Sequence, residues 1–115
     1  MNEAKNIIDN NWVSVCNETD LISNVGVCAL LGEKQVAIFK LSNGDIYAID
    51  NYDPFSNANV LSRGICGDLK NQPVVASPIY KQHFNLTNGQ CLEDESVSIP
   101  VYQIRVIDGM VEISE

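Results

Sequence analysis

Three Asn-Gly or Asp-Gly dipeptides constrain most strongly how this chain can fold. Asn43-Gly44, Asn88-Gly89 and Asp108-Gly109 are each flanked by short segments in which apolar and polar residues alternate. The tight turn of a two-residue hairpin needs positive φ at its central positions, a conformation that Asn, Asp and Gly adopt most readily. The dipeptides therefore predict hairpins, and with them an antiparallel β protein.

The segments around these turns predict short strands. They are rich in Val, Ile, Phe and Tyr, the residues that favour a pleated, half-buried surface. Gly32-Glu33 offers a fourth turn between two such segments. Strands are expected at 12–16, 25–31, 35–41, 45–50, 103–107 and 110–114.

Two helical turns are expected, and no long helix. Residues 18–22 can form one turn, and residues 54–59 can form another, because Asp53 can act as N-cap with Pro54 in the first helical position. We therefore predict one all-β domain over residues 1–115, an antiparallel sandwich or barrel of about eight to ten short strands. Residues 1–11 are expected to be frayed.

The charge of the chain argues against two classes of partner. Seven basic and fifteen acidic residues give a formal net charge of −8, which repels nucleic-acid phosphates and anionic lipid surfaces. The start of the sequence lacks the basic and apolar regions of a signal peptide, and no apolar run is long enough to span a bilayer. We expect a cytoplasmic protein with neither a nucleic-acid nor a membrane partner.

The cysteine and histidine content argues against a metal site and against catalysis. Cys16, Cys28, Cys66 and Cys91 include no C-x-x-C pair, so they are expected to be buried thiols that act as small hydrophobes. The one histidine, His83, supports no Ser/His/Asp or Cys/His arrangement, and no glycine-rich phosphate loop is present. No catalytic residue and no metal ligand is predicted.

Two segments interrupt the strand pattern: a first loop at 50–64 and a second loop at 76–84. Asn51 and Asp53 in the first loop, and Ser77 and Tyr80 in the second, have the spacing C-x-H and C-x-x-H with every ligand replaced. This pattern resembles the Rieske [2Fe–2S] domain, whose two loops each supply a Cys and a His. The resemblance implies that these four residues stand at vestigial ligand positions.

Amide and hydroxyl groups are poor donors to sulfide-bridged iron, so we expect no cofactor in this chain. The oxygen-rich set suits a hard cation better, but one carboxylate is too little charge for Mg²⁺ or Ca²⁺. His83 lies three positions beyond Tyr80 and is expected to point away from the core. Our hypothesis is that Tyr80 fills the vacated volume and hydrogen-bonds Asp53, which bridges the two loops.

A narrower resemblance covers nearly the whole chain. The segments that carry it are GVCALLGEKQVAIF at 26–39, NYDPF at 51–55, VLSRG at 60–64, VASPIYKQHF at 75–84 and NGQCLEDE at 88–95. They are similar to the small subunits of bacterial cytoplasmic NAD(P)H-dependent nitrite reductases, oxidoreductases of nitrate assimilation. The resemblance implies a non-catalytic accessory subunit. Its large partner subunit would carry FAD, an iron–sulfur cluster and sirohaem, and would reduce nitrite to ammonium.

The two loops also hold an island of positive charge beside aromatic residues on an otherwise acidic chain. Loops at one end of a rigid β scaffold commonly bind partners, and Arg with Tyr is typical of interface hot spots. We predict that this end docks the large subunit. The predicted docking residues are Tyr52, Phe55, Arg63, Tyr80, Lys81, Gln82 and His83.

Three alternatives stay open at this point. The charges of the two loops can be ordinary solvated residues beside buried aromatics, as we also expect for the acidic run at 93–95. The chain can be a ferredoxin-like electron carrier that keeps a redox centre through unusual ligands. It can also be a free-standing Rieske-like binding or regulatory module, because one fold hosts many functions.

Overall fold

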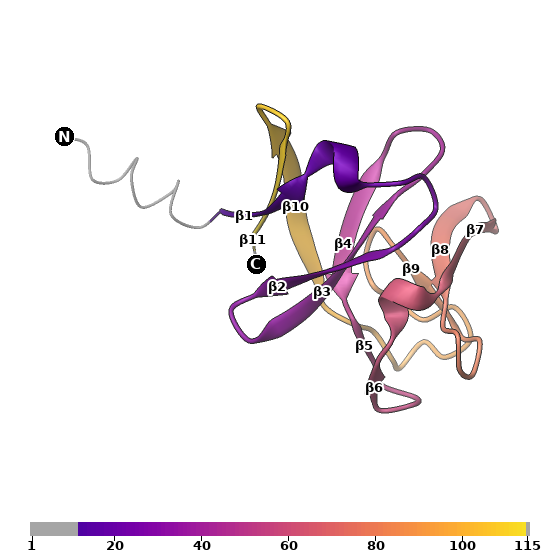
Figure 1. Cartoon of the computed structure of the whole chain (residues 1–115). Coiled ribbons are helices and arrows are strands. Elements are labelled where there is room, and N and C mark those ends of the chain that lie inside the picture. The colour runs from indigo at the N-terminus through magenta and orange to yellow at the C-terminus, as the bar shows by residue number, and fades with distance from the viewer. Residues whose placement is uncertain (1–11, 115) are drawn as a thin grey trace.

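The fold is all-β, as the turn dipeptides predict (Figure 1). A computed structural model describes residues 12–114, so the expected fraying of residues 1–11 lies outside the described residues. Two short 3₁₀ helices accompany the strands, Glu18–Asp20 (η1) and Leu61–Arg63 (η2). The strands are Val13–Asn17 (β1), Val27–Leu31 (β2), Lys34–Lys40 (β3), Ile46–Asp50 (β4), Tyr52–Asp53 (β5), Ala58–Asn59 (β6), Ile65–Leu69 (β7), Gln72–Ala76 (β8), His83–Asn85 (β9), Val101–Ile107 (β10) and Met110–Ser114 (β11).

The strands form one large sheet and two small ones. The large sheet has the order β1-β11-β10-β4-β3-β2, and its two edge strands also contact each other, which nearly closes it into a barrel. The sheet β7-β8-β9 packs beside this barrel, and β5 and β6 form a short ribbon that projects at the lower end of the molecule in Figure 1. The predicted all-β antiparallel barrel with short hairpins is confirmed.

The predicted turns position these strands. Asp108 and Gly109 have φ of +52° and +80° and join β10 to β11. Gly44, with φ of +95°, follows β3 in the turn to β4, and Gly32, with φ of +63°, lies between β2 and β3. Positive φ at each of these positions explains why the sequence places Gly, Asn or Asp there.

The Asn88-Gly89 turn forms a hairpin that is only partly regular. Leu92 donates its N–H to the carbonyl of His83 over 2.9 Å, so the chain does turn back on β9. A second continuous strand is missing, because the Gln90 side-chain amide donates to the carbonyls of Glu95 and Val97 and bends the chain into a loop.

The predicted helical turn at 54–59 is wrong. Asp53 does accept hydrogen bonds from the Phe55 N–H and the Ser56 hydroxyl, as a cap would. Asn57, however, adopts φ of +57°, which ends the right-handed turn and returns the chain as β6 against β5. The other expected turn, at 18–22, is present as η1.

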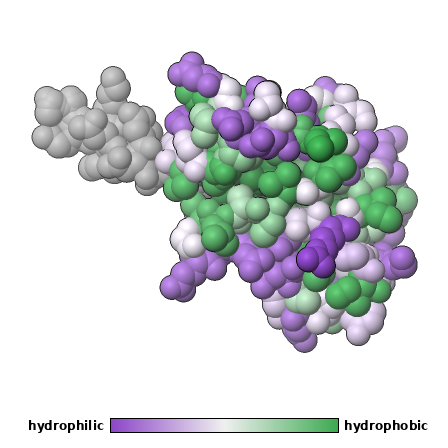
Figure 2. Space-filling model, viewed as in Figure 1, coloured by the Kyte–Doolittle hydropathy of each residue, from purple (hydrophilic) through white to green (hydrophobic). Residues whose placement is uncertain are grey.

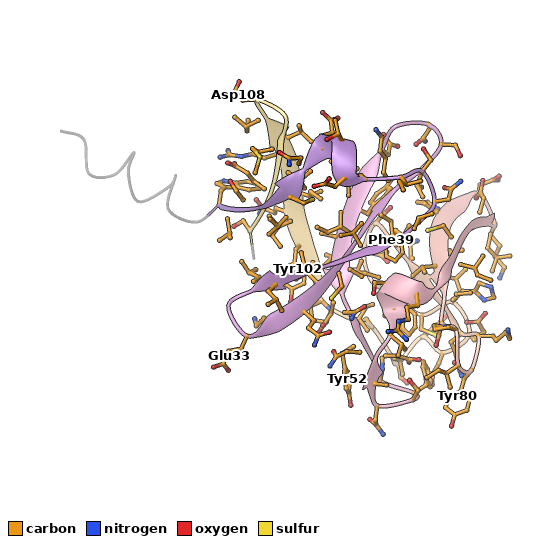
Figure 3. All side chains as sticks on the ribbon, viewed as in Figure 1. Glu33, Phe39, Tyr52, Tyr80, Tyr102 and Asp108 are labelled. Carbon is orange, nitrogen blue, oxygen red and sulfur yellow. The ribbon has the colours of Figure 1, made fainter. Side chains whose placement is uncertain are left out.

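Strand β3 is buried on both faces and joins two hydrophobic cores. Val36 and Ile38 point into the barrel, while Ala37 and Phe39 point toward the β7-β8-β9 sheet, and all four side chains are fully buried. Phe39 therefore lies between the barrel and the small sheet (Figure 3). This double burial fixes where the small sheet, and the second loop that follows β8, sit on the barrel.

The prediction of four buried cysteines is only partly right. Cys91 is buried in the core, but Cys16 and Cys66 are half-buried and Cys28 is exposed. Cys28 is exposed because it alternates with the buried Ala29 on β2, an edge strand of the large sheet. Desolvation by burial raises the pKa of the Cys66 thiol to about 11.

Across residues 12–114, no helix is long and apolar enough to cross a membrane.

Two glycines test how turn geometry and crowding contribute to stability. Gly89 and Gly109 share a φ of +80°, but a Cβ on Gly89 would lie 2.0 Å from the Ile99 carbonyl oxygen, whereas one on Gly109 would meet open space. We expect Gly109→Ala to lower the free energy of unfolding by about 1 kcal/mol through backbone strain alone. Gly89→Ala should cost at least about 3 kcal/mol, because the clash adds to the strain. Urea denaturation of both variants measures this difference, and equal losses would contradict the assigned turn packing.

Candidate functional site where two loops converge

Asn51, the first of the four predicted vestigial ligand positions, is buried and holds the start of the first loop. Its side-chain amide donates to Gln35 Oε1 over 3.1 Å, and its Oδ1 accepts the Ser62 N–H over 2.7 Å. Its amide also lies 3.6 Å from the Cys28 sulfur. Both ends of this amide are therefore committed to the fold, one to β3 and the other to η2.

Asp53, the second position, is a fully buried carboxylate that accepts three hydrogen bonds. The Phe55 N–H donates to Oδ1 over 2.9 Å, and the Ser56 hydroxyl donates to Oδ2 over 2.9 Å. The third donor is the Ser77 hydroxyl, which reaches Oδ2 over 2.5 Å from the second loop. Charge-assisted bonds of this kind compensate a carboxylate for lost hydration.

Ser77, the third position, organises the second loop from its own buried site. Its hydroxyl donates to Asp53 and accepts the Ile79 N–H over 3.3 Å. Its backbone N–H donates to the Gln82 carbonyl over 2.9 Å, which closes a tight turn over residues 77–82. The same residue therefore shapes the second loop and connects it to the first.

Tyr80, the fourth position, does not bridge the loops as the sequence hypothesis expected. Its side chain is 61% exposed and lies with Tyr52 at one end of the molecule, here called the loop end (Figure 3). The turn over 77–82 carries Tyr80 outward, and Lys81 within it has φ of +70°. Asp53 already has its three donors, so Ser77 takes the bridging role that we assigned to Tyr80.

The residues at these four positions do not fit a [2Fe–2S] cluster. Iron of this kind takes thiolate and imidazole ligands, and the positions offer an amide, a carboxylate, a hydroxyl and an outward phenol. The amide and the carboxylate are also occupied by hydrogen bonds within the protein. In the part of the chain that the structure describes, no three His, Cys, Asp or Glu side chains are grouped so as to hold a metal ion.

Glu93 holds His83 in place, a contact that the sequence interpretation missed. One carboxylate oxygen accepts the His83 backbone N–H over 2.8 Å, and the other lies 2.6 Å from His83 Nδ1. Burial by itself raises the pKa of Glu93. The two hydrogen bonds and the charge of His83 lower this pKa by more, so that it lies below its usual value. The sequence predicts that the acidic run at 93–95 is solvated. Its first residue, Glu93, instead has a structural role.

The predicted docking residues all lie in the two loops, and they differ in exposure. Tyr52, Arg63, Tyr80 and Lys81 are exposed, while Gln82 and His83 are half-buried. Phe55 is the exception, because its ring packs on the buried Phe84 at a centroid distance of 6.1 Å.

Two exposed apolar residues beside this set were not predicted. Ile65, 72% exposed, pairs across the sheet with Ala76 directly before Ser77, and Ile79, 45% exposed, belongs to the 77–82 turn. On the face drawn in Figure 2, the broadest apolar area lies over the barrel, and smaller ones lie toward the small sheet and the loop end. Exposed isoleucines next to Arg and Tyr give the loop end the composition of an interface. No signal in the sequence marks them, because exposure depends on how the small sheet packs.

The near-closed barrel, the small sheet beside it and the two loops between them define a Rieske-like domain. Residues 11–114 match the family described as Rieske-like [2Fe-2S] domain, and the chain belongs to this family. It is 46% identical over 103 residues to the nitrite reductase (NADH) small subunit of Escherichia coli K12. The matched residues make up 89% of this chain and 95% of the Escherichia coli chain. Within the Rieske-like domains, the chain is thus a member of the nitrite reductase small subunit family.

Two further comparisons concern a large subunit and a solved structure. A stretch of the nitrite reductase [NAD(P)H] large subunit of Klebsiella oxytoca is 37% identical over 100 residues, covering 87% of this chain and 10% of that one. The crystal structure of a NADH-dependent nitrite reductase small subunit from Mycobacterium tuberculosis superposes with a TM-score of 0.87 at 45% identity, covering 90% and 94% of the two chains.

A ferredoxin shares the fold alone. The ferredoxin of carbazole 1,9a-dioxygenase from Nocardioides aromaticivorans has a TM-score of 0.78 at 16% identity, covering 90% of this chain and 97% of that one.

The Glu93 contact predicts a defined pH dependence. Because the folded-state pKa of Glu93 is lowered, its pairing with His83 adds stability above the usual pKa of 4.5, and this is lost as pH falls through the lowered value. Glu93→Gln should reduce the free energy of unfolding at pH 7 by about 0.5 kcal/mol, since the pair is partly exposed. The difference from wild type should vanish toward pH 3, as chemical denaturation at several pH values would measure. Glu95→Gln, an equal charge change at an exposed residue of the same acidic run, is the control.

Proposed function

We propose that this chain is the small accessory subunit of a cytoplasmic NAD(P)H-dependent nitrite reductase and binds the large subunit without carrying an iron–sulfur cluster itself. The observation that carries the proposal is the 46% identity to an Escherichia coli small subunit across nearly the full length of both chains. The donor groups at the four vestigial positions support the absence of a cluster, because they do not suit iron.

The Klebsiella relative supports the large subunit as partner. There, a domain similar to this chain makes up a tenth of a polypeptide named as the large subunit. A domain that is covalently part of the large subunit in one organism is expected to bind it non-covalently where it is a separate chain. By the family resemblance, the FAD, the iron–sulfur cluster and the sirohaem belong to that partner, which reduces nitrite to ammonium.

The positions of the chain ends support docking by the loop end. The start of β1 and the end of β11 are paired, Val13 opposite Ile113, and lie away from the two loops (Figure 1). In the Klebsiella protein, at least one end of the domain must continue into the rest of the polypeptide. A connection at the terminal side leaves the loop end free to contact the large subunit.

A ferredoxin-like carrier is the second candidate, favoured only by the shared fold. Iron and acid-labile sulfide analysis of the isolated chain, with a visible spectrum, separates the two functions. We expect no stoichiometric iron and no charge-transfer bands, together with copurification of the sirohaem subunit from the native organism. Stoichiometric iron in the isolated chain would contradict the absence of a cluster, and failure to copurify would favour a free-standing module.

Charge reversal at the loop end tests the docking surface. Arg63 and Lys81 are exposed and have no ion pair among the described residues. Arg63→Glu and Lys81→Glu should each weaken binding to the large subunit about tenfold, mainly through slower association at low salt. Lys70→Glu makes the same charge change at the opposite end of the β7–β8 hairpin and should leave the affinity unchanged. Unaltered affinity in both loop-end variants, measured by biolayer interferometry, would place the interface elsewhere.

A further inference from the structure

Each of the two loops is shaped by its own hydrogen bonds, and the two sets meet at one contact. In the first loop, Asp53 accepts the Phe55 N–H and the Ser56 hydroxyl, and its backbone carbonyl accepts the Asn57 N–H. In the second loop, the Ser77 hydroxyl accepts the Ile79 N–H. The Ser77 hydroxyl then donates to the Asp53 carboxylate, 24 residues away in the sequence.

This contact is the sole hydrogen bond between residues 51–57 and residues 77–82 that the structure records among the described residues. Asp53 is fully buried and Ser77 is 2% exposed, so water cannot substitute for either partner. A charge-assisted bond that is shielded from water is stronger and more directional than an exposed one. Loss of the Ser77 hydroxyl would therefore remove the hydrogen bond that restrains residues 51–57 and 77–82 against each other, while the packing of Phe55 on Phe84 at the base of the loops would remain.

We propose that the Asp53–Ser77 bond holds the two loops in the arrangement that binds the large subunit. Asp53 and Ser77 are thus positioning residues, and the exposed side chains of the same loops, Tyr52, Ile79 and Tyr80, make the contacts. Association with a preorganised surface avoids the entropy cost of ordering loops on binding. This inference rests on the proposed function, since it assigns a role within the docking surface proposed there.

The chain offers a matched control for this bond. Ser56 and Ser77 both donate a hydroxyl to the same oxygen, Asp53 Oδ2, over 2.9 and 2.5 Å. Ser56 lies in the first loop with Asp53, so Ser56→Ala removes a donor without separating the loops. Ser77→Ala removes a donor to the same atom and also removes the hydrogen bond between the two loops. A difference between the two variants therefore reports the connection and not the loss of a hydroxyl.

Hydrogen exchange of the isolated chain tests the connection without any partner. Ser77→Ala should raise the exchange rates of backbone amides in both 52–57 and 79–82 by about tenfold or more, because the bond restrains both loops. Ser56→Ala should affect residues 52–57 alone. Equal effects of the two variants, or exchange confined to 79–82 in Ser77→Ala, would overturn the proposal.

Affinity for the large subunit tests the consequence for binding. Val111→Ala, a truncation in the barrel core remote from the loops, serves as a control for reduced global stability. At a temperature where every variant is folded, Ser77→Ala should bind about tenfold more weakly, and Val111→Ala should stay within about threefold of wild type. Ser56→Ala loosens the first loop alone and should lose less affinity than Ser77→Ala. Wild-type affinity in Ser77→Ala would overturn the positioning role. Failure of the wild-type chain to bind would instead overturn the proposed function.

Discussion

The buried carboxylate of Asp53 is the interaction on which the loop end depends. A carboxylate removed from water needs donors around it, and Asp53 takes them from Phe55, Ser56 and Ser77. Two of these donors shape the first loop locally, and the third brings in the second loop. The loops therefore converge through a hydrogen bond between side chains, at positions where a Rieske centre would join them through iron.

Strand β3 connects this contact to the rest of the fold. Its side chains fill the barrel core on one face and the core shared with the small sheet on the other. The same strand carries Gln35, whose carbonyl accepts the Asn51 N–H over 3.0 Å and whose side chain accepts the Asn51 amide. The strand that fixes the small sheet on the barrel thus also fixes the start of the first loop. Rigidity at the loop end follows from packing at the centre.

Local chemistry explains which features could be predicted from the sequence. The Gly and Asn-Gly or Asp-Gly turns require positive φ at known positions, so the hairpins at 43–44 and 108–109 followed from residue type alone. The two loops followed from the interruption of the strand pattern, and the vestigial ligand positions are what the resemblance to the Rieske domain implies. The sequence predicts that Tyr80 bridges the two loops, because a large side chain is expected to fill the volume left by a cluster. The bridging role belongs to Ser77, because the 77–82 turn directs Tyr80 outward. Glu93 was missed because its partner lies across a turn, ten residues away.

The most direct test of this account is hydrogen exchange of the chain alone and bound to the large subunit of a nitrite reductase. We predict protection on binding over residues 52–57 and 77–82, including the exposed 77–82 turn, with unchanged exchange in β1 and β11, at the terminal side. Protection confined to β1 and β11, with the two loops exchanging as in the free chain, would contradict docking by the loop end.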